Sequence, residues 1–237
     1  MTANITASVL IIGNEILSGK TQDANLQFMG EAFARLGINL VEARVIRDEP
    51  DVISAVVNEL AARYTYVFTT GGIGPTHDDL TAASVANAFG VELVLDEDAA
   101  QRLGRGSREL TPARLKMAMI PDGASLIDNP ISHAPGFRIE NVFVMAGIPS
   151  IARAMFAAIE HELKGGDPIL SESVDIFASE GDIAAPLDEI AKRHTEVEIG
   201  SYPFSREGRY GASLVVRGTD PARIAAALAE IREKLLA

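Results

Sequence analysis

Short apolar runs alternate with amphipathic stretches through the first half of the sequence, and this alternation constrains the fold more than any other feature. The runs 8–12, 40–45 and 66–69 have the length of strands, and their apolar character predicts strands buried on both faces. Residues 24–36 and 50–60 place apolar side chains at helical spacing. Strand–helix–strand repeats predict right-handed crossovers, and hence an α/β fold with three layers around a parallel sheet.

Glycines and a hairpin pattern mark further elements. Gly37 and Gly90 stand where two of the helices should end. Residues 96–123 predict an irregular helical stretch that is interrupted by glycine and proline. The runs 137–139 and 142–145 are separated by two polar residues, which predicts a hairpin or a turn between short strands.

A turn-rich segment, 164–168, predicts a boundary between two domains. We expect residues 1–166 to form the parallel-sheet domain and residues 167–237 to form a small α+β domain. In the smaller part we expect strands 169–178, 196–202 and 209–217, and helices 182–194 and 221–236.

The charge balance restricts the classes of partner. Asp and Glu outnumber Lys and Arg by 33 to 21, which gives a net charge of −12. This argues against nucleic acid and anionic membranes, because both need a positive face. Cysteine is absent, so thiolate chemistry is excluded. With no signal peptide and no apolar run long enough to cross a bilayer, the expected location is cytoplasmic.

Three glycines within four positions follow the third predicted strand, at Gly71, Gly72 and Gly74. Glycine lets a backbone approach a ligand closely, and the N–H groups of such a turn can cradle a phosphate. The dipole of a helix beginning near Asp78 would strengthen the binding of that phosphate. We therefore predict that segment 69–81 binds a small phosphorylated ligand. Its ligand-binding candidates are Thr70, Gly71, Gly72, Gly74, Thr76 and Thr81.

Two adjacent carboxylates, Asp78 and Asp79, follow the glycines. Beside a phosphate they favour a bridging divalent cation such as Mg, Mn or Co, so both are candidate catalytic residues and metal ligands. Asp78 has an alternative role as the N-cap of the next helix, and Asp79 as a cap or as a partner of a ligand ring or sugar. The neighbouring His77 is expected to be exposed.

A second polar cluster follows the first predicted strand, at the edge where parallel sheets bind their ligands. Gly13 and Asn14 are ligand-binding candidates. Glu15 is a catalytic candidate that would bind a cation or accept a hydrogen bond from a base or ribose. Asp23 fits the N-cap of the following helix, and Asn25 inside that helix is a further ligand-binding candidate.

Later loops supply the remaining candidates. Pro135 and Gly136 end a proline-rich loop, which is either a rigid connection or part of the site. Gly147 allows close backbone approach before another helix. A basic run predicts a solvated face, with neutralisation of ligand phosphates as the alternative. This run holds Arg102, Arg105, Arg108, Arg114 and Lys116.

The segment 69–81, which ends in Gly-Pro-Thr-His-Asp-Asp-Leu-Thr, resembles the signature of the molybdopterin-binding domains of MoaB, Mog and MoeA proteins. Its form is similar to the N-terminal module of CinA-type competence- and damage-inducible proteins. The loops 13–25 and 129–136 resemble the same module, and residues 200–218 resemble the small domain that follows it. The resemblance implies a parallel α/β domain that binds a pterin or an adenine nucleotide at these loops, and it implies homo-oligomers.

For CinA-type modules the resemblance implies a metal-dependent pyrophosphatase acting on ADP-ribose-like substrates, and a related module of FAD synthases is associated with FAD hydrolysis. Asp79 matches the motif aspartate. The chain departs from the family pattern Pro-Gly-x-Pro-x-Glu, with Ala146 and Ile151 in place of the proline and the acid. Two alternatives therefore stand beside the enzyme: a molybdopterin-binding protein of molybdenum cofactor biosynthesis, and a non-catalytic nucleotide-sensing module.

Overall fold

The computed structural model describes residues 5–105, 109–206 and 208–236. These residues divide into two compact units, one built mainly from the chain up to Gly166 and the other mainly from Asp167 onward. Arg108 of the basic run lies outside the described residues.

A six-stranded sheet in the order β2-β1-β3-β8-β7-β6 forms the centre of the larger unit. Its four parallel strands are β1 (Thr6–Ile12), β2 (Asn39–Ile46), β3 (Tyr66–Thr70) and β8 (Val142–Met145). The strands β7 (Gly136–Ile139) and β6 (Ser125–Ile127) complete the sheet, each antiparallel to its neighbour. The predicted parallel sheet and the predicted hairpin are therefore both confirmed.

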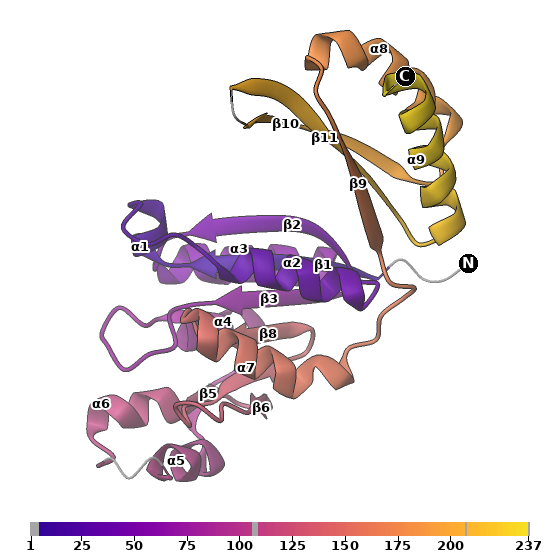
Figure 1. The fold of residues 1–237 in the computed structure, drawn as a ribbon. Helices are drawn as coiled ribbons and strands as arrows, with labels where there is room; N and C mark the ends of the chain where they lie inside the picture. Colours follow the sequence, from indigo (N-terminus) through magenta and orange to yellow (C-terminus); the bar gives the residue numbers. More distant parts are fainter. Residues whose placement is uncertain (1–4, 106–108, 207, 237) are drawn as a thin grey trace. The chain divides into compact units, whose positions relative to one another are not determined.

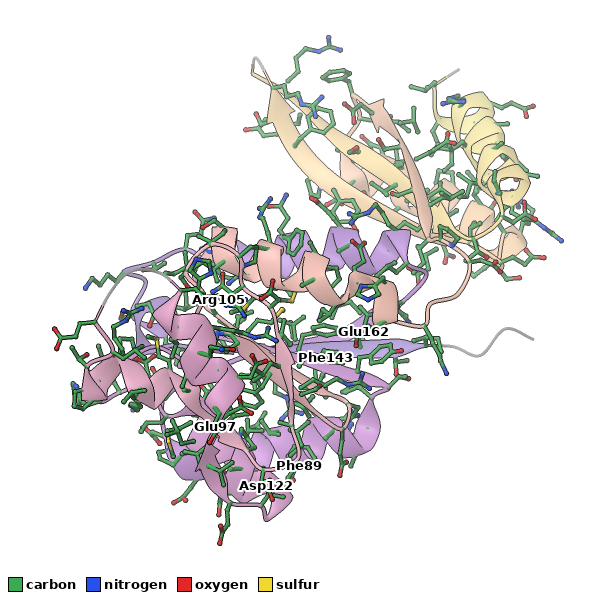
Figure 2. The ribbon with its side chains drawn as sticks, turned by 90° about the horizontal axis from the view of Figure 1, so that it is seen from below. Phe89, Glu97, Arg105, Asp122, Phe143 and Glu162 are labelled. Carbon is green, nitrogen blue, oxygen red and sulfur yellow. The ribbon has the colours of Figure 1, made fainter. Side chains whose placement is uncertain are left out.

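Helices cover both faces of this sheet and make three layers (Figure 1). On one face, α2 (Asn25–Arg35) and α7 (Pro149–Ile159) pack through aromatic rings, with the Phe33 and Phe156 rings 4.9 Å and 5.8 Å from the Phe68 ring. Phe143 of β8, labelled in Figure 2, is fully buried, and its ring stacks on that of Phe68. On the other face, α3 (Pro50–Arg63) and α4 (Thr81–Phe89) carry apolar side chains of a second buried cluster.

Two of the helices end where their glycines predict. Gly37 follows α2 with φ of 64°, and Gly90 caps α4 with φ of 66°, both in the left-handed region that favours glycine. The backbone N–H of Gly37 donates to the Ala34 carbonyl at 3.1 Å, and that of Gly90 to the Asn87 carbonyl at 3.2 Å. These stops confirm the helix boundaries that the sequence predicts.

The prediction of an irregular helical stretch at 96–123 is wrong at its carboxyl end. The stretch begins with α5 (Glu97–Gly104), α6 (Pro112–Leu115) and the single 3-10 turn η1 (Lys116–Ala118). It then forms a strand, β5 (Met119–Pro121), which pairs antiparallel with β4 (Leu93–Leu95). Three residues are too few to establish the alternation that identifies a strand. Two short elements complete this unit, α1 (Asn14–Leu17) and η2 (Glu160–Glu162).

The smaller unit has the predicted three strands and two helices. Its antiparallel sheet has the order β10-β11-β9, formed by β9 (Leu170–Ile176), β10 (Glu198–Arg206) and β11 (Arg209–Gly218). The helices α8 (Glu180–Arg193) and α9 (Pro221–Leu235) bury their apolar faces with this sheet in a separate core. Within the described parts of both units, no helix is long and apolar enough to span a membrane.

Candidate functional site

The glycine turn begins where β3 ends, at the carboxyl edge of the sheet. Gly71 and Gly72 have φ of 102° and 68°. Space also requires glycine, because a Cβ on Gly71 would lie 2.1 Å from the Ile12 carbonyl oxygen and one on Gly72 would lie 2.2 Å from the Thr81 hydroxyl. The buried Thr81 closes the turn by donating its hydroxyl to the Gly71 carbonyl at 2.9 Å and its N–H to the Gly72 carbonyl at 3.0 Å. Packing alone thus fixes this part of the backbone.

The two aspartates converge on the hydroxyl of Thr76. Oδ1 of Asp78 and Oδ2 of Asp79 each lie 2.5 Å from Thr76 Oγ1, and Asp79 also accepts the Thr76 N–H at 2.8 Å. A hydroxyl has a single proton, so it cannot donate fully to both carboxylates. The Thr76 hydroxyl holds the pKa of Asp78 below its ordinary value. The carboxylates of Asp78 and Asp79 therefore lie side by side, with fewer hydrogen-bond donors around them than they could accept from.

The suggested capping role of Asp78 is wrong. The helix that follows, α4, begins only at Thr81, with Leu80 in the cap position and no side-chain cap. The expected start near Asp78 is therefore three residues too early. Asp78 and Asp79 lie in the turn itself, so both carboxylates remain available to a ligand.

The three oxygens gathered at Thr76 fit a hard divalent cation. Mg²⁺ is typically held by one or two carboxylates, and phosphate and water oxygens complete its coordination. In the described part of the chain, no group of three or more His, Asp or Glu side chains converges, so the protein would supply only part of the coordination. His77 is exposed as expected, with 98% of its side chain accessible.

A hollow of about 450 Å³ opens beside the glycine turn. Gly72, Gly74 and Asp79 contribute to its polar side. Its other walls are apolar and come from the turn itself, α4, β4, η1, β5, β7 and the loop before β7. They consist of Ile73, Ala82, Ala83, Leu93, Met117, Met119, Ile120, Pro135 and Phe137. Apolar walls beside a few polar groups suit a ligand with a ring system and a phosphate.

Lys116 also lines this hollow, from the start of η1. Its Nζ donates to the Thr76 carbonyl, across 40 residues of sequence. Other members of the basic run are engaged elsewhere: Arg102 pairs with two aspartates, and Arg114 donates to two backbone carbonyls. The sequence indicated a basic run but did not single out Lys116, because only the fold brings η1 to the turn.

Behind the turn, three glycines bring together the ends of three adjacent strands. Gly13 follows β1, Gly71 follows β3 and Gly147 follows β8; we call these residues the glycine floor. A Cβ on Gly147 would lie 3.3 Å from the Gly71 Cα atom, so the two backbones are in close contact. A Cβ on Gly13 would lie 2.6 Å from Oε1 of Glu15, so that carboxylate lies over the floor. The adjacent Asn14 donates its N–H to the Asp48 carboxylate at 2.8 Å.

The first residue of α2, Asn25, meets the floor from one side. Its Nδ2 donates to the Gly147 carbonyl at 2.8 Å, while its Oδ1 is buried with no hydrogen-bond partner among the described residues. The buried Thr70 hydroxyl, at the end of β3, also has no partner. Unpaired buried polar atoms are costly and often mark functional positions. Asp23 accepts the Leu26 N–H at 2.8 Å, as expected of a residue that caps α2.

Gly71 belongs to the floor and Gly72 lines the hollow, so the two halves of the candidate site meet at adjacent residues. Gly136 stands between two residues that line the hollow, Pro135 and Phe137, and a Cβ there would be 2.4 Å from the Val144 carbonyl oxygen, so the pairing of β7 with β8 requires glycine. Ile151, which occupies the position of the family's acid, is buried in α7. It contributes apolar packing at that position.

Comparison with known proteins finds a family match for each of the two units. The family described as "Probable molybdopterin binding domain" matches residues 8–165, and the family described as "FAD synthase, middle domain" matches residues 168–237. In a search of solved structures, the protein CinA from Thermoplasma acidophilum superposes with a TM-score of 0.63 at 34% identity. That alignment covers 68% of this chain and 99% of the other.

Sequence relatives fall into several kinds. A curated protein of Archaeoglobus fulgidus is 32% identical over 195 residues, which cover 82% of this chain and 84% of that protein. A CinA-like protein of Desulfosudis oleivorans is 40% identical over 63% of this chain, and a probable FAD synthase of Caenorhabditis elegans is 29% identical over 97% of it. The alignments span only 38% and 50% of those two longer relatives.

Proposed function

The chain belongs to the CinA type of the molybdopterin-binding domain family. We propose that it binds a phosphorylated nucleotide at its glycine turn. We further propose that it hydrolyses the pyrophosphate bond of ADP-ribose- or FAD-like substrates with a divalent metal. One observation carries the proposal. The carboxylates of Asp78 and Asp79 and the hydroxyl of Thr76 converge at the mouth of a hollow with apolar walls.

The two halves of the site suit a ligand with two ends. The apolar walls of the hollow would hold a planar ring, and the N–H groups of the turn would approach the phosphates. The second end would lie against the glycine floor, close to the α2 N-terminus and to Asn25. A dinucleotide laid across Gly71 and Gly72 would place its pyrophosphate beside the acid pair.

In the hydrolysis a water oxygen bonds to one phosphorus atom while the bridging P–O bond breaks, which releases AMP and a second phosphomonoester. Asp78 and Asp79 would hold the metal, with Thr76 fixing the orientation of both carboxylates. A divalent metal held there would supply positive charge at the phosphate oxygens and would favour deprotonation of the attacking water. Glu15, which lies over the floor, is the candidate acceptor for the proton that the water loses.

Molybdopterin binding without hydrolysis is the second candidate. The family supports it, and a hollow with apolar walls beside an N–H-lined turn also suits a pterin and its phosphate. The burial of Ile151 at the position of the family's acid favours a binding role as well.

Product analysis separates the two candidates. The purified chain is incubated with ADP-ribose or FAD in Mg²⁺, Mn²⁺, Co²⁺ or a chelator, and AMP is quantified by chromatography. We expect AMP release that requires a metal. Absence of AMP in every metal, together with tight binding of molybdopterin, would replace the pyrophosphatase by the second candidate.

A further inference from the structure

We propose that Lys116 binds the diphosphate of the substrate and is the residue through which this acidic chain distinguishes a nucleoside diphosphate from the nucleoside alone. The inference rests on the proposed function, because it concerns the same site. It assigns a role to a side chain on a different element, η1, which the fold brings beside the glycine turn.

The ammonium group of Lys116 is not held in an ion pair with any carboxylate of the described residues. Its Nζ donates to a carbonyl oxygen, that of Thr76, and it forms no ion pair within the ranges 5–105, 109–206 and 208–236. A neutral carbonyl satisfies one of the three ammonium protons and leaves the others for an anion.

Lys116 nevertheless lies close to the acid pair. It lines the same hollow as Asp79. The pKa of Asp78 is lowered first by the Thr76 hydroxyl, and the charge of Lys116 also contributes. A substrate that brings its phosphates to Asp78 and Asp79 with a metal therefore also brings them near the ammonium group. The ammonium group of Lys116, from η1, and the metal held by the two carboxylates of the turn would then contact the same diphosphate.

The other described residues of the basic run are held elsewhere or lie outside the hollow. Arg102 is held by Asp98 and Asp128, and the guanidinium of Arg114 donates to the carbonyls of Leu103 and Glu109. Arg105 is exposed at the end of α5 and does not line the hollow. Arg105 therefore serves as a matched control: a cation of the same run that lies outside the proposed site.

The hydrogen bond to Thr76 also gives Lys116 a structural role that the test must separate from ligand binding. This bond ties η1 to the loop that carries both aspartates. A loosened loop would weaken every ligand of the hollow, whereas loss of a phosphate contact weakens only phosphorylated ligands. Binding of ADP and of adenosine, compared within each variant, distinguishes the two causes.

The experiment is calorimetric titration of ADP and of adenosine into the intact chain, without metal, for the wild type, Lys116→Met, Lys116→Arg and Arg105→Met. Charge-assisted hydrogen bonds predict that Lys116→Met weakens ADP binding by about 10- to 100-fold. Its adenosine affinity should change by no more than about twofold. Lys116→Arg should retain most of the ADP affinity, and Arg105→Met should match the wild type. The wild-type preference for ADP should fall at high salt, and that dependence should be weaker in Lys116→Met.

Three results would overturn the inference: wild-type ADP affinity in Lys116→Met, an equal loss of ADP and adenosine in that variant, or a wild type that binds ADP no more tightly than adenosine. Failure of the proposed function has a different signature. In that case ADP binding depends on Lys116 as expected, yet metal-supplemented protein releases no AMP from ADP-ribose.

Discussion

Gly71 is the residue at which the site backbone has the least freedom. Its φ is 102°, and a Cβ would lie 2.1 Å from the Ile12 carbonyl oxygen, so an alanine meets both backbone strain and a collision. We expect Gly71→Ala to lower the free energy of unfolding by about 3 kcal/mol or more. Urea unfolding measures the change, with Gly90→Ala as the control. Gly90 has a similar left-handed backbone but open space around it, so about 1 kcal/mol is expected there.

Similar losses in the two alanine variants would contradict the close approach of Gly71 to the end of β1. The sequence predicted that the turn needs glycine, but it could not show why. The closest neighbour of Gly71 is a backbone carbonyl 59 positions earlier in the chain, and such a contact leaves no local pattern. The pairing of Lys116 with the Thr76 carbonyl was unpredictable for the same reason.

At the scale of elements, Glu230 ties the end of α8 to α9. Its carboxylate accepts from Lys234, His194 and Arg193, and these donors lower its pKa to about 2. A carboxyl whose pKa is depressed on folding stabilises the fold above its unfolded pKa, near 4.5, and this contribution is lost as pH falls toward 2. The smaller unit should therefore lose stability over that interval.

The variant Glu230→Gln tests this link. It should be less stable than the wild type at neutral pH, and the difference should shrink as the pH is lowered through the acidic interval. Thermal unfolding monitored by circular dichroism, from about pH 6 to about pH 2, gives the comparison. A stability difference that is independent of pH would rule out the charge of Glu230 as its origin.

The elements that the sequence located best are those long enough to show a period. The strand β1 and helices α2 and α3 fall close to their predicted positions because each buries a continuous run or stripe of apolar side chains. The strands β4, β5 and β6 have three residues each and escaped prediction. The start of α4 was misplaced because Asp78 resembles a cap, while its carboxylate is instead held by Thr76.

At the scale of the whole molecule, the proposed site lies in the larger unit, and the smaller unit has a core of its own. Leu214 is fully buried in that core, so Leu214→Ala should destabilise the smaller unit by about 2–5 kcal/mol. AMP release should persist under conditions where the variant remains folded. Unfolding by urea and initial rates of AMP release are to be measured on the same preparation. If Leu214→Ala lowers the rate of AMP release as much as Asp79→Asn does, the site does not lie in the larger unit alone.

The acid pair in the glycine turn is the central feature of this account, and one comparison tests it most directly. Initial rates of AMP release from ADP-ribose are measured in saturating metal for the wild type, Asp79→Asn and Asp122→Asn. Asp122, labelled in Figure 2, is an exposed acid that does not line the hollow, so its variant controls for loss of surface charge. We predict that Asp79→Asn lowers the rate by about 100-fold or more with little change in melting temperature, while Asp122→Asn keeps the wild-type rate. Equal rates for wild type and Asp79→Asn would contradict the account.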